Sequence, residues 1–191
     1  ERIPVTKDMA ERFIGGQGLG AYLLNEYVAP GIDPLGPDNA LIVCPGILVG
    51  TPVPSASRTT IISKSPTIGA FMGMSNGGGL QHVKLAGYDI LVVKGCADRP
   101  VYIKITNDRV EICDARHLWG KDTFETPDIL WSEIGDQYQI ATIGPAGENL
   151  VRHAAIIGDK YSAWGRTGLG AVMGSKKLKA IAVFGDVGVK V

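Results

Sequence analysis

Glycine is the residue type whose number and spacing point most directly to chemistry in this sequence. The chain has 26 glycines among 191 residues, roughly twice the average share. Three clusters, Gly15–Gly18, Gly77–Gly79 and Gly168–Gly170, stand between apolar runs. Glycine lacks a side chain and permits positive φ, so these clusters let a ligand approach the main chain closely. They predict a large polar ligand lying against backbone.

Polar residues beside the glycines could bind such a ligand. Arg58 begins a β-branched run, and Asn76 directly precedes Gly77 and Gly78. Taken alone, a strand-leading arginine is more often a solvated residue, and an asparagine beside glycines more often tolerates left-handed turn geometry. The residues by themselves therefore leave a binding role and a structural role open.

Other catalytic patterns find no support in the sequence. The three histidines and the three cysteines (Cys44, Cys96 and Cys113) are scattered, without metal-ligand spacing. No GxSxG, GxxxxGK[ST] or HExxH motif occurs. We expect the cysteines to be packing or bystander residues.

Composition and charge exclude further classes of protein. The formal net charge is zero and 45% of residues are hydrophobic, so no basic surface predicts nucleic-acid binding. No apolar run approaches the roughly 18 residues of a membrane span, and Glu1–Ala10 lacks the pattern of a signal peptide. We expect a cytoplasmic protein with no membrane partner.

The expected elements mix without the regular alternation of a doubly wound sheet, which indicates an α+β fold. Thr6 is expected to cap a helix reaching Tyr27. Further helices are expected to begin at Ser75–Gly79, at Thr126 and at Gly168. The expected strands are Leu41–Cys44, Arg58–Ser63, Ile90–Val93, Val101–Ile105, Arg109–Ile112, Gln139–Ile143 and Ala180–Val183.

An internal repeat relates two parts of the chain. Gly78–Gly95 aligns with Gly168–Gly185 at an offset of 90, and Arg58–Ile62 faces Arg152–Ile156 upstream. Identities are few, so the alternative to duplication is chance together with an order of elements that many folds share. Duplication predicts two halves, roughly 40–95 and 140–185, packed about a pseudo-two-fold axis. Each half would present a glycine-rich helix start, and two such anion sites suit a ligand with two phosphate-bearing halves.

Several motifs together resemble one known family. They are AGYDILVVKG (Ala86–Gly95), LWGKDTFET (Leu118–Thr126), IGPAGENLVRHAAI (Ile143–Ile156) and GRTGLGAVMGSKKLKAIAV (Gly165–Val183). In order and spacing the chain resembles the N-terminal domain of the tungsten-containing aldehyde ferredoxin oxidoreductases, over essentially all 191 residues.

The resemblance implies a β-saddle of two similar halves beneath a bis-pterin cofactor that carries tungsten or molybdenum, with Mg2+ bridging the pterin phosphates. It also implies that the [4Fe-4S] cluster and the substrate pocket belong to later domains, absent from this chain. The family oxidises aldehydes to carboxylic acids with ferredoxin as electron acceptor. Expected partners are ferredoxin, the aldehyde, the protein's own C-terminal domains and a second copy in a homodimer; the isolated domain is expected to be inactive.

Family roles transfer to seven residues and to no catalytic group. Arg58 matches a phosphate-binding position, and Asn76, Gly77 and Gly78 match the turn that meets the cofactor. Asn76 and the carbonyl of Ala163 match the magnesium ligands, since Mg2+ prefers oxygen. Gly165 and Arg166 follow beside them.

Three positions depart from the family pattern. Gln17 interrupts an early glycine motif, Ser162 stands where arginine is usual, and Trp164 stands where a small residue is usual. Losing an arginine removes a bidentate phosphate partner. The departures leave another family branch open, such as an aromatic-ring reductase. A non-catalytic anion- or nucleotide-binding module and a structural or dimerisation domain are further alternatives.

Overall fold

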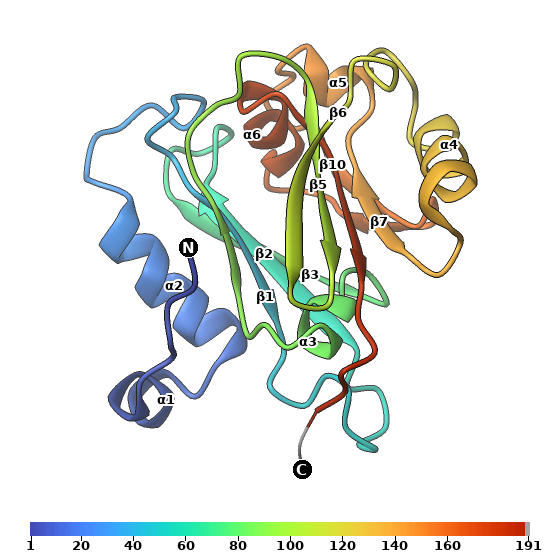
Figure 1. The fold of residues 1–191 in the computed structure, drawn as a ribbon. Helices are drawn as coiled ribbons and strands as arrows, with labels where there is room; N and C mark the ends of the chain where they lie inside the picture. Colours follow the sequence, from blue (N-terminus) through green and yellow to red (C-terminus); the bar gives the residue numbers. More distant parts are fainter. Residues whose placement is uncertain (190–191) are drawn as a thin grey trace.

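Two β-sheets flanked by helices form the protein in a computed structural model that describes residues 1–189 (Figure 1). The expected α+β fold class is confirmed. The first sheet has the order β3-β2-β1-β4 and the second the order β6-β5-β10-β7-β8-β9. The strands are β1 (Leu41–Pro45), β2 (Arg58–Lys64), β3 (Phe71–Gly77), β4 (Leu91–Val93), β5 (Val101–Thr106), β6 (Arg109–Asp114), β7 (Gln139–Thr142), β8 (Ile156–Gly158), β9 (Ser162–Trp164) and β10 (Leu178–Phe184).

The helices cover the outer faces of the sheets and fill part of the space between them (Figure 1). They are α1 (Lys7–Phe13), α2 (Gly16–Tyr27), α3 (His82–Leu85), α4 (Glu125–Ile134), α5 (Pro145–Glu148) and α6 (Leu169–Ser175). Among the residues described, no helix combines the length and apolar character needed to cross a membrane.

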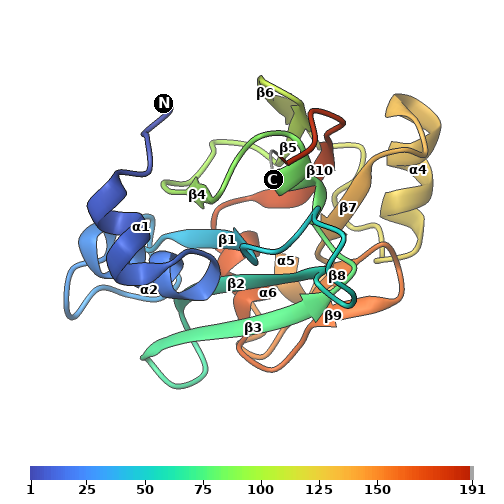
Figure 2. The same ribbon diagram turned by 90° about the horizontal axis from the view of Figure 1, so that it is seen from below.

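The two sheets share one order of connection. β1, β2, β3 and β4 occupy the same relative places as β7, β8, β9 and β10, and every adjacent pair within these sets is antiparallel where its pairing is defined. A short helix, α3 or α6, precedes the last strand of each set. The β5–β6 hairpin extends the second sheet through a parallel pairing of β5 with β10. The edge strands β3 and β9 contact each other where the sheets meet (Figure 2).

Alternation along β1 explains how the first sheet is buried on both faces. Leu41 and Val43 join the core between the sheets, whereas Ile42 and Cys44 join the cluster beneath α2. Successive strand residues point to opposite faces, so a continuous apolar run is the pattern of a strand covered on both sides.

The strand β10 shows the same alternation in the second sheet. Ile181 and Val183 face the core between the sheets, and Ala180 and Ala182 face the cluster beneath α4. α6 contributes Leu169 and further apolar residues to the central core. Helix, sheet, shared core, sheet and helix therefore form successive layers.

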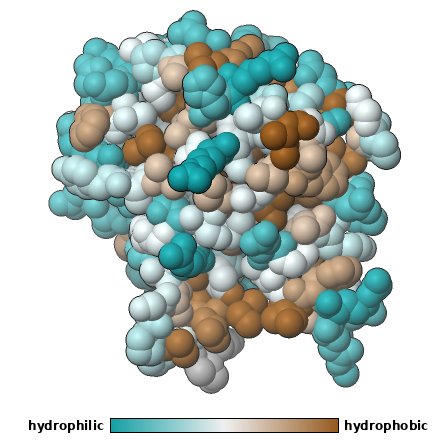
Figure 3. All heavy atoms as spheres, turned by 180° about the vertical axis from the view of Figure 1, so that it is seen from behind, coloured by the Kyte–Doolittle hydropathy of each residue, from teal (hydrophilic) through white to brown (hydrophobic). Residues whose placement is uncertain are grey.

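Apolar residues also reach the surface near the chain termini. Figure 3 shows them as a band along the lower edge of the face opposite to that in Figure 1. Ile47, from the loop after β1, packs against Gly15 at the joint between α1 and α2. Exposed large apolar residues between α1 and α2, in the loop after β1 and near the C-terminus are Ile14, Ile47, Leu48, Val53 and Val187.

The helix expected from Thr6 to Tyr27 is two helices. Thr6 does cap the first, since its hydroxyl accepts the Met9 N–H at 3.2 Å. The chain then breaks at Ile14 and Gly15, both with positive φ, before α2 begins. In the sequence, the glycines that interrupt the helical pattern after Phe13 already indicated this break.

The helix start expected at Ser75–Gly79 is wrong. Ser75, Asn76 and Gly77 belong to β3, and the helix that follows has only four residues. Ser75 pairs with Thr60 of β2, and their hydroxyl oxygens lie 2.6 Å apart. Pairing between distant segments therefore overrode the local glycine-rich pattern.

Two further expectations near strand and helix starts are corrected. The first turn of α4 is held by the Asp122 carboxylate, which accepts the N–H groups of Phe124 and Glu125 at 2.7 Å, and not by Thr126. Arg152 does not lead a strand, because it lies in a turn before β8. The alignment of Arg152 with Arg58 in the internal repeat is therefore wrong, because Arg58 begins its strand and Arg152 lies before its own.

Candidate functional site

One group of predicted site residues lies at the end of the β2–β3 hairpin. Arg58 begins β2 and pairs with Gly77, the last residue of β3. Asn76 is the neighbour of Gly77 and is buried, while Arg58 and Gly77 are exposed. The Gly78 N–H donates to the Ser57 carbonyl at 3.3 Å, which extends the hairpin pairing by one residue. Strand pairing therefore places these predicted residues next to one another.

A second group follows from the hairpin β8–β9. Ala163 is exposed on β9, and Gly165 and Arg166 come directly after that strand. The turn before β9 is anchored by Asp159, whose carboxylate accepts the Ile140 N–H at 2.7 Å. Burial raises the pKa of Asp159, opposed by that hydrogen bond. β3 and β9 are both edge strands, so each keeps a row of backbone groups free of sheet pairing.

Trp164 connects the two groups. It is fully buried, and its indole Nε1 donates to the Thr59 carbonyl at 2.8 Å across 105 residues of sequence. Its ring lies against Gly79, where an added Cβ would come within 2.5 Å. Ala163 and Gly165, the chain neighbours of Trp164, are thereby held beside the segment that begins at Asn76.

Arg166 lies toward the other end of β2. Its neighbour Thr167 accepts a hydrogen bond through its carbonyl from the Ser65 hydroxyl at 2.7 Å. Thr59 and Ser65 are six residues apart along an extended segment, a span of about 20 Å at the usual rise of a strand. Arg58 and Arg166 therefore lie near opposite ends of this segment.

The glycines divide into two kinds. A Cβ added to Gly77, Gly78 or Gly165 would meet no atom within 4 Å, so these positions border open space. A Cβ at Gly168 or Gly170 would instead come within 1.9 Å and 2.4 Å of a backbone oxygen of the protein itself. The expectation that the Gly168–Gly170 cluster faces a ligand is therefore wrong, because this helix start packs against its own chain.

Two of the arginines offer unused charge. Within residues 1–189, neither Arg58 nor Arg166 takes part in a salt bridge, whereas Arg99, Arg109 and Arg116 each contact a carboxylate. Guanidinium groups bind phosphate and carboxylate in a bidentate manner. Both unpaired arginines are exposed and can receive an anion.

Sequence reasoning singled out Asn76 but neither of the two threonines that, like it, carry a buried polar atom near the site. Thr59 Oγ1, Asn76 Nδ2 and Thr167 Oγ1 are buried and have no hydrogen-bond partner in the described part of the chain. Native proteins leave few such atoms unpaired, and these often mark a site of function or ordered water. The two threonines could have been noticed in the sequence, because each directly follows one of the predicted site arginines, in Arg58-Thr59 and Arg166-Thr167.

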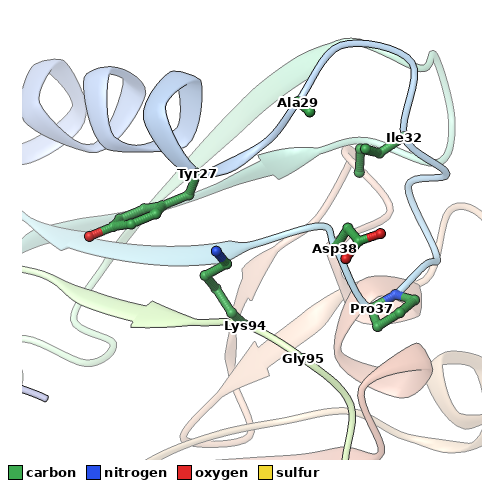
Figure 4. A pocket seen from close by; sticks show the side chains of 7 residues that line it. All are labelled: Tyr27, Ala29, Ile32, Pro37, Asp38, Lys94 and Gly95. Atoms are coloured by element: carbon green, nitrogen blue, oxygen red, sulfur yellow. The ribbon is translucent and has the colours of Figure 1, made fainter.

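The clearest pocket lies away from these residues. It has a volume of about 380 Å³, and Figure 4 shows its lining side chains. Lys94 lies over the ring of Tyr27, with Nζ 4.9 Å from the ring centroid. The seven predicted residues line neither this pocket nor a smaller one beside α5. The candidate site is thus an open face that the described residues do not enclose.

A side-chain metal site is missing from residues 1–189. No group of three or more His, Cys, Asp or Glu residues is placed to hold a metal ion there. The three cysteines are free, and burial of Cys44 raises the pKa of its thiol to about 12.

Comparison with known proteins assigns this chain to a family. The sequence profile of the aldehyde ferredoxin oxidoreductase N-terminal domain matches residues 1–185. The chain belongs to this family. The resemblance in the motifs between Ala86 and Val183 is confirmed.

Relatives within the aldehyde ferredoxin oxidoreductase family act on different compounds. The tungsten-containing aldehyde ferredoxin oxidoreductase of Thermococcus kodakarensis is 51% identical over 183 residues, covering 94% of this chain and 30% of that protein. The aliphatic sulfonate oxidoreductase WOR-like subunit of Pyrococcus furiosus is 37% identical over 204 residues, covering 97% of this chain and 32% of that subunit. The chain therefore spans about a third of the length of these curated relatives.

A solved structure has the same fold. The active-site complex BamBC of benzoyl coenzyme A reductase with 1,5-dienoyl-CoA matches with a TM-score of 0.94 and 40% sequence identity, covering 97% of this chain and 28% of that chain. The arrangement of the two sheets is therefore shared with a protein whose name gives a different class of substrate.

The residues present fit the cofactor that the family implies. Gly77 and Gly78 leave room for close approach to backbone, Arg58 lacks an anion partner, and the buried Asn76 amide has bonding capacity to spare. Ser162 cannot stand in for the usual arginine, because its hydroxyl donates to the Gly158 carbonyl at 3.0 Å.

Proposed function

We propose that this chain forms the face of a family oxidoreductase that holds the phosphates of a bis-pterin tungsten or molybdenum cofactor. The observation that carries the proposal is the set at the end of β2–β3: the exposed, unpaired Arg58 beside the open backbone of Gly77 and Gly78 and the buried, unsatisfied amide of Asn76. A large anion lying on main chain uses all three features.

Each residue then has one role. Arg58 pairs with a cofactor phosphate, and Gly77 and Gly78 admit the ligand to backbone distance. Asn76 and the Ala163 carbonyl would hold Mg2+ through oxygen, and the ion would help to neutralise the phosphate charge. Gly165 leaves room beside Ala163, and Arg166 binds an anionic part of the ligand further along β2.

Internal duplication supports the shape of this face. The shared order β3-β2-β1-β4 and β9-β8-β7-β10 favours two related halves, 40–95 and 140–185, meeting at β3 and β9. Such a pair forms a saddle for a ligand with two similar parts. We assign the binding surface to the edge strands β3 and β9, and not to the two helix starts expected from the sequence. The helices α3 and α6 are short and packed against protein.

The whole protein then oxidises an aldehyde to a carboxylic acid and passes the electrons to ferredoxin. The cofactor supplies the two-electron chemistry when bound, and this chain supplies orientation and charge neutralisation. The [4Fe-4S] cluster, the substrate pocket and contacts with a second copy belong to the rest of a cytoplasmic enzyme. The isolated chain is inactive because it carries only one wall of the site.

A reductase acting on an aromatic thioester is the second candidate function. Its support is the solved benzoyl coenzyme A reductase complex, at 40% identity and a TM-score of 0.94. The two functions differ in electron flow: the first yields reduced ferredoxin from aldehydes, and the second consumes reductant on an aryl-CoA. Assaying the full-length protein with both substrates decides between them.

Substitution at the site tests the cofactor role. Arg58→Ala and Asn76→Asp in the full-length protein should lower the ratio of pterin to protein, since the first removes a phosphate partner and the second adds negative charge beside the phosphates. Arg109→Ala is the matched control, because Arg109 is exposed and paired with Glu111 at 2.8 Å. Wild-type pterin content in both site variants would rule out these roles.

A further inference from the structure

Trp164 occupies a position where two separate segments of the candidate site meet. It belongs to β9 and pairs with Ile156 of β8, yet its side chain reaches β2. The indole N–H donates to the Thr59 carbonyl at 2.8 Å, and the residue has no exposed surface. A directional, fully desolvated bond between distant strands fixes their relative placement.

Two glycines make room for the indole ring. A Cβ on Gly79 would come within 2.5 Å of Cη2 of the ring, and a Cβ on Gly158 within 3.1 Å of Cζ3. One glycine follows β3 and the other ends β8, so the ring is wedged between the two sheets. The amide nitrogen of Asn76 lies 3.2 Å and 3.4 Å from the same two Cβ positions. The ring and the Asn76 amide therefore share one tightly packed space.

The proposal that follows rests on the proposed function. We infer that Trp164 is a positioning residue that sets the spacing between Asn76–Gly78 and Ala163–Gly165, the two segments that would hold the cofactor. It acts through the Thr59 carbonyl and through its packing on Gly79, and it does not itself touch the cofactor.

Trp164→Phe removes the indole N–H and keeps most of the ring. In the full-length protein, purified without oxygen, the variant should lose pterin about five times faster on dilution at a temperature where it remains fully folded, the effect expected for one lost hydrogen bond. The electron paramagnetic resonance signal of the W(V) or Mo(V) state should also broaden, because the pterins are held less uniformly.

A matched control separates positioning from general packing. Trp131 also donates its indole N–H to a backbone carbonyl, that of Tyr138, at 2.8 Å, but it belongs to α4 and packs, partly buried, against the cluster beneath that helix. Trp131→Phe should change the melting temperature and leave pterin loss and the resonance signal as in the wild type. Equal pterin loss in wild type and Trp164→Phe, or the same loss in Trp131→Phe, overturns the inference.

Hydrogen exchange on the wild type provides a second measurement if Trp164→Phe does not fold. Cofactor-loaded protein should show slower amide exchange in both Asn76–Gly79 and Ala163–Gly165 than protein stripped of cofactor. Protection confined to one segment contradicts the inference while leaving cofactor binding intact. A wild-type protein with no pterin overturns the proposed function and this inference together.

Discussion

Lys179 and Glu148 form a buried ion pair, with Nζ 2.5 Å from Oε1 and side chains 0% and 5% exposed. Glu148 also accepts the Gly120 N–H through both carboxylate oxygens, at 3.0 Å and 2.9 Å. Lys179 donates to the Lys121 carbonyl at 2.7 Å. The pair therefore ties β10 and α5 to the loop before α4. Burial lowers the pKa of Lys179, while the bond to Glu148 opposes that shift.

Removing one member of this pair should be costly. Lys179→Met leaves a buried carboxylate without its cation, and breaking such a pair costs about 3–5 kcal/mol. Urea or thermal unfolding measures the loss. Arg116→Ala, which breaks an exposed contact with Asp114, should cost far less, because solvent screens an exposed pair. A loss for Lys179→Met no larger than for Arg116→Ala would show that the pair contributes little.

A second buried lysine predicts a dependence of stability on pH. Lys176 is 3% exposed, and its Nζ donates to the carbonyls of Asn39, Gly95 and Pro37 at 2.5, 3.0 and 3.4 Å. Burial lowers the pKa of Lys176 from 10.5 to about 8. Between those two values the unfolded chain binds more protons than the folded protein, so stability rises with pH across that range.

The test compares wild type with Lys176→Met, which cannot titrate at this position. The difference in unfolding free energy between them should move in favour of the wild type as pH rises from 8 to 10, because the cost of burying the charge is relieved. Below pH 8 the difference should be constant. If the stability of the wild type relative to Lys176→Met instead fell with rising pH, the three carbonyl hydrogen bonds would stabilise the charged amine by more than burial destabilises it.

Substitution by alanine should have different effects at a glycine that borders open space and at a glycine that packs against protein. A Cβ at Gly77 meets nothing within 4 Å, whereas one at Gly79 comes within 2.5 Å of Trp164. Gly77→Ala should change stability by no more than about 0.5 kcal/mol, yet lower pterin content in the full-length protein, since the methyl group occupies ligand space. Gly79→Ala should destabilise by about 1–3 kcal/mol through overpacking.

Unfolding curves and pterin content, measured on both variants, separate the two effects. Gly69→Ala is unsuitable as a control because Gly69 has a positive φ, as does Gly78. Gly165→Ala is a second test of open space, since its Cβ also meets no neighbour. Full pterin content in stable Gly77→Ala and Gly165→Ala proteins would argue against a ligand lying on this backbone.

Much of the fold could be predicted because burial on both faces leaves a continuous apolar run. Leu41–Cys44 and Ala180–Val183 carry that run and are strands in the structure. β3 was missed because Phe71–Gly77 contains two glycines and a polar end, and it becomes a strand only through its pairing with β2. β8 and β9 were missed because each is three residues long.

The candidate site could be predicted only in part. Arg58, Asn76 and Ala163 were proposed through family resemblance, and strand pairing brings the first two close together. The contact of Trp164 with Thr59 spans 105 residues, and no local pattern encodes such a distance. The packing of Gly168 on backbone was likewise hidden, because sequence does not distinguish a glycine that admits a ligand from one that admits its own chain.

The most direct test measures tungsten, molybdenum, iron and oxidised-pterin fluorescence in the longest native form of the protein, purified without oxygen. We predict two pterins for each tungsten or molybdenum atom, with iron also present, and loss of pterin in Arg58→Ala. An intact long form with neither pterin nor heavy metal would contradict the account, and would leave a domain that kept the two-sheet fold without the cofactor.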